Sequence, residues 1–518
     1  MSAQVGISAD HRWTEEQTRW RDYYLCRLHE QLTWAMVCAR QPEKLAAHFD
    51  SVLTLLGHAL AWPHLRTQAA ELVAALGDWP TRWGYWDAWE EMLRFGVMAT
   101  DSKWEPARYF ALLAELSHLL FDTGRLEQAL DIALQVVTHS AAANAPTPFA
   151  RAASLAVQVL MRQGKMGDAQ HILEQVEPQL KQAADASAAL AYLYVARSSF
   201  LRRQGDLDRA LLWADRAVTA AEAPSDSDLH LSGDTYHFRG VMRWARGEYA
   251  LAAADLDRAA ALYASSGDRY AEASVQGNLG LVYWSMGELD RAESLFRHII
   301  AVAEQHKARW QIAVHVGNMG LVYLSRGKLE LALSYSERHL HVATQNGDIQ
   351  EIMRARGIRG TTLLHQGNIA AALADLDAER AFCEERGSPE GLVCNYVSYV
   401  RCLAALGRGG EALALAQQAL DIARTSSPSI QVLALRSLAE WSPVAQRELM
   451  LREALSLAQR MGRQLDQAAC LLSLAALKAG KEQASLWSKG KRLLEKIGAV
   501  AWLAGHSPQN PPQIVLAG

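Results

Sequence analysis

Arginine, aromatic and amide side chains recur in this chain at fixed distances before a periodic glycine. A guanidinium group binds carboxylates through two parallel hydrogen bonds, and arginine and aromatic residues dominate the binding energy of protein interfaces. An asparagine amide can pair with a peptide backbone through both its donor and its acceptor. Offsets of 13, 10, 9, 6, 3 and 2 residues before the glycine select Arg151, Arg162, Tyr192, Arg202, Arg203, Phe238, Trp244, Asn278, Trp284, Asn318, Arg354, His365 and Arg401. These residue types predict a surface that binds a partner by recognition and not by catalysis.

The periodic glycines set the architecture that must position these side chains. They are Gly84, Gly124, Gly164, Gly205, Gly247, Gly287, Gly327, Gly367 and Gly407, with gaps of 40 to 42 residues. A repeat of roughly 20 to 50 residues is typical of a solenoid, whose units bury their apolar faces only against their neighbours. The spacing therefore predicts an extended array of similar units.

Each unit is predicted to be a helical hairpin. The clearest copies are 277–296 and 317–336, in which apolar residues recur at helical spacing on both sides of the periodic glycine. That glycine is expected to end the first helix in the left-handed conformation, which it adopts without a Cβ penalty. A second glycine in each copy, such as Gly280 or Gly320, falls inside the first helix and predicts a close crossing with a small residue such as Ala332.

The pattern Leu279-Gly280-x-x-Tyr283 followed by Gly287, Ala292 and Phe296 resembles the tetratricopeptide repeat. Its spacing is similar to that of the 40-residue class found in cell-polarity and signalling scaffolds. The resemblance covers roughly residues 80–423 and implies an all-α fold, an α-solenoid of helical hairpins that forms a right-handed superhelix. It also implies that the first helices line a concave groove, which would contain the arginine, aromatic and amide side chains.

Residues outside the periodic region are expected to form caps. The predicted boundaries are an N-terminal helical cap at 1–78, the repeat array at 79–423, atypical repeats and a cap at 424–502, and a disordered tail at 503–518. Nine of the sixteen tryptophans precede residue 105, so the large rings either close the end of the array or form an exposed docking face. The run WPTRWGYWDAWEEMLRFG resembles the first repeat in the C-terminal halves of bacterial STAND signalling ATPases, but no GxxxxGK[ST] phosphate loop accompanies it.

Composition and motifs argue against several classes of protein. The net charge of −4 disfavours nucleic acid as a partner, and no apolar run is long enough to predict a membrane span. The six cysteines form no CxxC pair, which favours reduced thiols and a cytoplasmic location. His339 and His341 do not share a helix face, and neither a catalytic motif nor a metal-ligand motif is present. We therefore expect no enzyme activity, no cofactor and no metal.

The predicted function is that of a protein-protein interaction scaffold or adaptor that binds a partner peptide segment in the concave groove. An acidic peptide, or one ending in a carboxylate, would meet the groove arginines. The alternative is a ligand-sensing regulatory module of a STAND-like signalling system that acts with a separate effector. A purely structural reading also stays open, because Arg202 and Arg203 suit any helix C-terminus and Asn278 and Asn318 can bond to a neighbouring helix.

Overall fold

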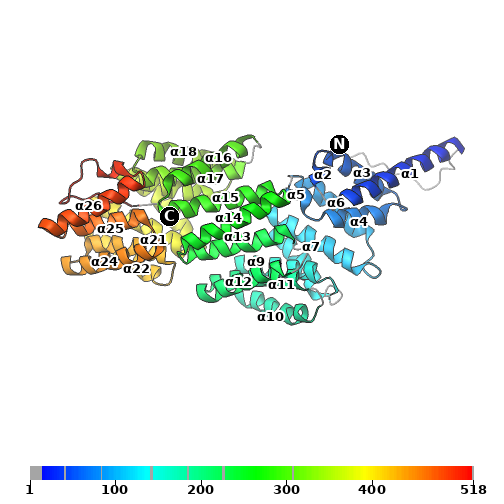
Figure 1. Cartoon of the computed structure of the whole chain (residues 1–518), viewed down its shortest axis with the longest axis horizontal. Helices are drawn as coiled ribbons and strands as arrows, with labels where there is room; N and C mark the ends of the chain where they lie inside the picture. Colours follow the sequence, from blue (N-terminus) through cyan, green and yellow to red (C-terminus); the bar gives the residue numbers. More distant parts are fainter. Residues whose placement is uncertain are drawn as a thin grey trace. The chain divides into compact units, whose positions relative to one another are not determined.

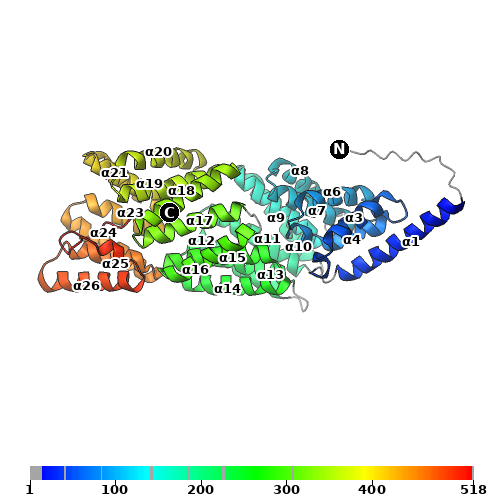
Figure 2. The same ribbon diagram turned by 90° about the horizontal axis from the view of Figure 1, so that it is seen from above.

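The fold is all-α, as the glycine spacing predicts. The computed structural model describes residues 15–39, 43–82, 84–139, 144–183, 186–223, 228–305 and 309–515, and these contain 26 α-helices and one 3₁₀ helix. Consecutive helices pack as antiparallel hairpins (Figures 1 and 2). The chain divides into two compact units, Met1–Phe200 with Thr219–Ser227, and Leu201–Val218 with Asp228–Gly518, so that the division passes through α11 (Ser187–Arg203) and α12 (Leu207–Glu222).

Unit 1 has its own hydrophobic core, which runs from Leu28 to Phe200. Its remaining helices are α1 (Glu15–Cys38), α2 (Glu43–Ala46), α3 (Phe49–Ala61), α4 (Arg66–Leu76), α5 (Trp79–Arg82), α6 (Trp86–Ala99), α7 (Pro106–Asp122), α8 (Leu126–Thr138), α9 (Pro146–Arg162) and α10 (Met166–Gln182). Regular hairpins begin at α7, because the first periodic glycine, Gly84, follows only the four-residue α5.

Unit 2 contains the most regular hairpins and a second core, which runs from Tyr249 to Val515. Its helices are α13 (Leu229–Ala245), α14 (Tyr249–Ser266), α15 (Arg269–Met286), α16 (Leu289–Gln305), α17 (Arg309–Ser325), α18 (Leu329–Asn346), α19 (Ile349–His365), α20 (Ile369–Arg386), α21 (Pro389–Ala405), α22 (Gly409–Ala423), α23 (Pro428–Trp441), α24 (Val444–Met461), α25 (Gln464–Ala475), α26 (Gly480–Lys496) and η2 (Val500–Leu503). From α7 to α25 the odd-numbered helices are the first helices of the hairpins, and we call them first helices below.

The periodic glycines end the first helices as predicted. Gly287 has a φ of 83°, and its N–H bonds to the carbonyl of Trp284. The next amide, that of Glu288, donates to the Tyr283 carbonyl at 2.8 Å, which satisfies another of the carbonyls left free at a helix C-terminus. Only glycine adopts this backbone conformation without strain, and it reverses the chain into the second helix.

The glycines inside the first helices have unequal surroundings. A Cβ on Gly280 would lie 2.5 Å from the Phe296 ring, which is fully buried, so these two helices do approach too closely for a side chain. At Gly320 the nearest atom would be Ile358 Cγ2 at 3.5 Å, an ordinary contact. The predicted close crossing of Gly320 with Ala332 is therefore wrong. At the equivalent Gly280 there is no room for a side chain, but the group that fills the space is the Phe296 ring and not a small residue.

The predicted disordered tail is also wrong for the residues that the structure describes. Residues 504–515 follow η2, and Ile514 and Val515 are buried in the core of unit 2. The burial of these two side chains and hydrogen bonds to three first helices hold the segment in place. The final residues of that prediction, 516–518, lie outside the described residues, as do 1–14 and 40–42 of the predicted N-terminal cap.

Candidate functional site

The first helices of unit 2 lie next to one another as well as next to their hairpin partners. α17 contacts α19, α19 contacts α21, and α21 contacts α23. Side chains that hold the same place before the turn in successive repeats therefore come together. We call the predicted binding residues, from Arg151 to Arg401, the stripe. Most of its members bond within the chain.

Two tryptophans of the stripe form equivalent hydrogen bonds in successive repeats. Trp244 Nε1 donates to Ser285 Oγ at 3.1 Å, and Trp284 Nε1 donates to Ser325 Oγ at 2.8 Å. Each bond joins residues 41 positions apart, which is one repeat plus one residue. The indoles thus fix the register between neighbouring first helices.

The amide side chains of the stripe are also engaged between repeats. Asn278 Nδ2 donates to His237 Nε2 at 2.7 Å. Arg354 donates to Asn318 Oδ1 and, at 2.7 Å, to Glu351. These contacts favour the structural reading of the two asparagines.

Three predicted residues belong to unit 1 and lie among aromatic and acidic groups. Arg151 pairs with both carboxylate oxygens of Glu115, and its guanidinium carbon is 5.8 Å from the centre of the Tyr192 ring. Burial alone would lower the pKa of Arg151, but Glu115 and its other neighbours outweigh burial and raise it. Arg162 lies over the Phe121 ring at 4.5 Å. The carboxylate that Arg151 was expected to receive from a partner is supplied by the chain itself.

Arg202 and Arg203 are exposed, as is Arg162, whereas the other predicted binding residues are at least partly buried. They occupy the last turn of α11, where a positive charge interacts favourably with the helix dipole. They are accordingly better placed to meet another molecule than the partly buried arginines, or than Arg162, which lies over the Phe121 ring.

The C-terminal segment contacts the stripe through its main chain. Arg401 Nη1 donates to the Gln513 carbonyl at 3.3 Å, and Arg436 Nη2 donates to the Ile514 carbonyl at 2.5 Å. His365 Nε2 donates to the Val515 carbonyl at 2.9 Å. Three first helices, α19, α21 and α23, thus bind three consecutive carbonyl groups. We call His365, Arg401 and Arg436 the carbonyl-binding triad.

Apolar contacts accompany these bonds. Ile514 is 2% exposed and Val515 is 5% exposed, and both belong to the core of unit 2. Residues 511–515 form neither helix nor strand, and the carbonyls of residues 513–515 accept hydrogen bonds from side chains. The arrangement binds polypeptide backbone and two aliphatic side chains at once.

Burial sets the protonation state of the histidine in the triad. It lowers the pKa of His365 to about 4, with a further contribution from the Arg401 guanidinium, so the imidazole is neutral near pH 7. Arg401 lies 3.6 Å from Glu440, and burial lowers its pKa. Arg436 is paired with Asp466 at 2.7 Å. Both arginines therefore have a carboxylate partner besides the carbonyl they bind.

Sequence reasoning selected His365 and Arg401 but missed Arg436. The glycine spacing weakens after Gly407, so the fixed offsets before a periodic glycine select no residue beyond that point. Arg436 lies six residues before the turn at Ser442, just as Arg401 lies six residues before Gly407. Counting back from that turn would have found it.

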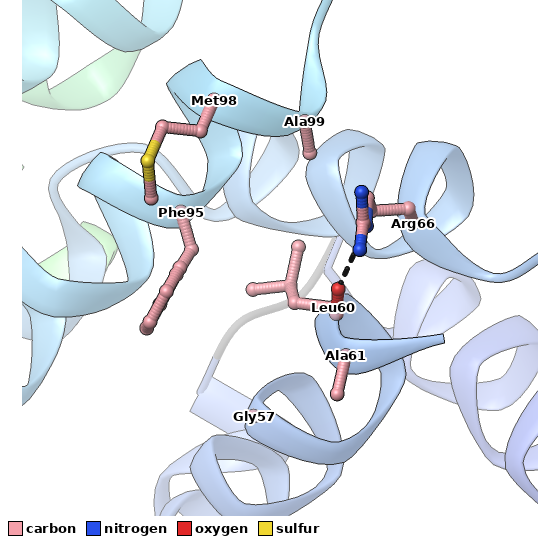
Figure 3. Close-up of a pocket in the computed structure, with 7 residues that line it drawn as sticks. All are labelled: Gly57, Leu60, Ala61, Arg66, Phe95, Met98 and Ala99. Carbon is pink, nitrogen blue, oxygen red and sulfur yellow. Dashed lines mark hydrogen bonds between the residues drawn. The ribbon is translucent and has the colours of Figure 1, made fainter. Parts of the chain in front are cut away.

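Unit 1 contains a separate apolar pocket, between α3, α4 and α6 (Figure 3). Its volume is about 360 Å³, and it is lined by Gly57, Leu60, Ala61, Arg66, Phe95, Met98 and Ala99. Phe95 and Met98 are 39% and 71% exposed, and Arg66 Nε donates to the Leu60 carbonyl at 3.0 Å. The tryptophans near the N-terminus differ in burial. Trp89 is fully buried and Trp104 is 84% exposed, while Trp83 lies outside the described residues.

The comparisons with known proteins agree with the repeat geometry. Residues 231–305 match the family model described as tetratricopeptide repeat. The chain contains tetratricopeptide repeats (TPRs). Their first helices are α13 and α15, which carry Trp244 and Trp284. No curated protein matches the chain in sequence.

Several solved structures are similar to the chain. A Rap protein complexed with Competence and Sporulation Factor is 14% identical, covering 68% of this chain and 99% of its own, with a TM-score of 0.48. A STAND protein with a TPR sensor from Pyrococcus horikoshii is 12% identical, covering 64% of this chain and 52% of its own (TM-score 0.46). Aspartyl phosphate phosphatase F from Bacillus subtilis is 12% identical, with coverages of 69% and 93% (TM-score 0.45). Similarities of this size carry no information about function.

Neither a membrane-spanning helix nor a metal-binding cluster occurs among the described residues. None of the described helices is long and apolar enough to cross a membrane. Within the same residues, no three histidine, cysteine, aspartate or glutamate side chains are grouped so that they could hold a metal ion.

Proposed function

We propose that this protein is a non-catalytic scaffold or adaptor that binds a segment of a partner protein along its first helices. The observation that carries the proposal is the carbonyl-binding triad, because its three side chains bind consecutive main-chain carbonyls of a non-repeat segment. A surface that recognises backbone in this way suits peptides of varied sequence. The TPR match at 231–305 supports the same role.

The test is affinity capture from native lysate with three forms of the chain. Wild type is compared with Arg202→Glu/Arg203→Glu, which reverses the exposed arginines of α11. The control is Arg209→Glu/Arg424→Glu, which reverses two arginines with 67% exposed side chains, one on α12 and one directly after α22. Surface ion pairs contribute little to stability, so all three forms should fold. A partner recovered with wild type and control, and lost with the α11 variant, supports binding along the first helices. Equal recovery with all three forms excludes the exposed arginines of α11 from binding, and recovery of no partner with any form contradicts the proposal.

The pocket of unit 1 favours a second candidate function, that of a ligand-sensing module. Its volume of about 360 Å³ is within the range of small-molecule sites, and Gly57 has open space where a side chain would begin. Gly57→Leu should therefore fill the pocket without a clash. Small molecules that raise the melting temperature of wild type, and not of Gly57→Leu, would support sensing; ligands that stabilise both forms equally would place binding elsewhere.

A further inference from the structure

We infer that residues 513–515 occupy in cis a groove where a partner peptide binds, and that the partner has the same chemistry. That partner is a non-helical segment with two adjacent aliphatic side chains and free carbonyl groups. The inference rests on the proposed function and adds to it the recognised motif and its regulation by the chain's own C-terminal segment.

The first argument concerns what the triad recognises. Each of its donors bonds to a main-chain oxygen, so the polar part of the site selects a backbone conformation and not a particular side chain. Pro511 and Pro512 precede the bound residues, and prolines favour the extended polyproline conformation, whose carbonyls have no internal partner. Selectivity comes from the buried side chains of Ile514 and Val515.

The second argument concerns the cost of release. When the C-terminal segment leaves, Arg401 still has Glu440 at 3.6 Å, and Arg436 still has Asp466 at 2.7 Å. Neither guanidinium is left as an unpaired buried charge, which is the costly outcome of breaking a buried ion pair. The segment is therefore bound in a way that permits exchange.

The third argument concerns the attachment of the segment. Trp502 remains anchored on α17, because its Nε1 donates to the Ser325 carbonyl at 2.9 Å. Only residues 503–512 separate this anchor from the bound residues, and a short tether gives an effective concentration of about 1 mM. A free peptide with an intrinsic Kd of about 10 µM would then bind the intact chain roughly 100-fold more weakly.

The test uses the full chain and a fluorescein-labelled peptide of residues 508–515, PQNPPQIV, with an amidated C-terminus. Wild type is compared with Ile514→Asp/Val515→Asp, which should release the segment, and with the same variant carrying Arg401→Gln. Fluorescence anisotropy should show binding to the released variant about 100-fold tighter than to wild type, and a loss of at least tenfold on adding Arg401→Gln. A peptide with aspartates at the two aliphatic positions is the probe control.

Circular dichroism and the melting temperature establish that each variant is folded, and Val515→Asp alone serves as a milder release variant. If folded release variants bind PQNPPQIV no better than wild type does, the inference is wrong. If binding improves but is indifferent to Arg401→Gln, the triad is not the site. If wild type forms a dimer that is lost when Ile514 and Val515 are substituted, the segment binds the groove of a second copy. Binding in cis would then be wrong. None of these results affects the Arg202 and Arg203 test, so the proposed function stands or falls separately.

Discussion

Trp502 donates its indole hydrogen bond to the main-chain carbonyl of Ser325, 2.9 Å away and 177 residues earlier in the chain. The indole also covers Gly327, where an added Cβ would lie 3.2 Å from three ring atoms. The His365 ring meets it edge-on, with centroids 4.8 Å apart. Trp502 is 8% exposed. One side chain thus fixes the C-terminal segment to the first helices of two successive repeats.

This relationship predicts different outcomes for two alanine substitutions in similar turns. Gly327 and Gly367 have φ values of 73° and 80°, so alanine should cost about 1–2 kcal/mol at either position through backbone strain. No atom lies within 4 Å of a Cβ at Gly367, whereas Gly327→Ala also pushes against the Trp502 ring. Hydrogen exchange of residues 500–515 should therefore accelerate in Gly327→Ala and stay unchanged in Gly367→Ala. Equal exchange in the two variants would contradict the anchoring role of Trp502.

The sequence predicted the repeats well because the signals involved are local. A glycine that ends a helix and apolar residues at helical spacing act within one hairpin, so their period predicts the hairpins of both units. Contacts between side chains of different repeats are harder to predict from the sequence. Asn278 bonds to His237, which lies 41 residues away, and only the packing of neighbouring first helices shows that the two meet.

The C-terminal segment was missed for a different reason. Residues 503–518 contain prolines and glycines and no helical period, which is also the signature of disorder. Ile514 and Val515 become ordered because three first helices from distant parts of the chain meet around them. Asp375 is likewise buried by partners that its sequence context does not reveal: it is 4% exposed and pairs with Arg359 through both oxygens at 2.7 Å.

The glycines inside the first helices provide a second prediction. Gly280→Ala should destabilise the protein by about 1–3 kcal/mol, because the new methyl group overlaps the buried Phe296 ring. Gly320→Ala should stabilise it by up to about 1 kcal/mol, since alanine is the better helix former and its nearest neighbour is 3.5 Å away. Urea unfolding of the two variants beside wild type measures both effects. Destabilisation of equal size in the two variants would show that the helix crossings are alike.

A buried carboxyl group gives a prediction about pH. Burial raises the pKa of Glu379 from 4.5 to about 7, although Asn395 donates to it at 2.8 Å. Because the folded pKa is the higher one, the group adds stability below pH 4.5 and loses it as the pH rises through 7. Glu379→Gln cannot ionise, so it should match wild type near pH 4.5 and exceed it by about 3 kcal/mol at pH 8. Denaturant unfolding at the two pH values is the measurement. A constant difference between the variants would mean that Glu379 does not titrate in this range.

His365 predicts the opposite dependence of stability on pH. Burial lowers its pKa from 6.5 to about 4, so between these two pH values His365 is protonated in the unfolded chain and neutral in the folded chain. Its contribution to stability is complete above pH 6.5 and is lost as the pH falls toward 4, by up to about 1.4 kcal/mol per pH unit. His365→Gln retains an amide that can donate to the Val515 carbonyl but does not titrate. The melting temperature of wild type should therefore fall more between pH 7 and pH 5 than that of His365→Gln. The same proton would place a second positive charge beside Arg401. The protection of the Ile514 and Val515 amides, measured relative to their intrinsic exchange rates at each pH, should therefore fall from pH 7 to pH 5 in wild type and stay constant in His365→Gln. Parallel behaviour of the two proteins would show that another group controls release of the segment in acid.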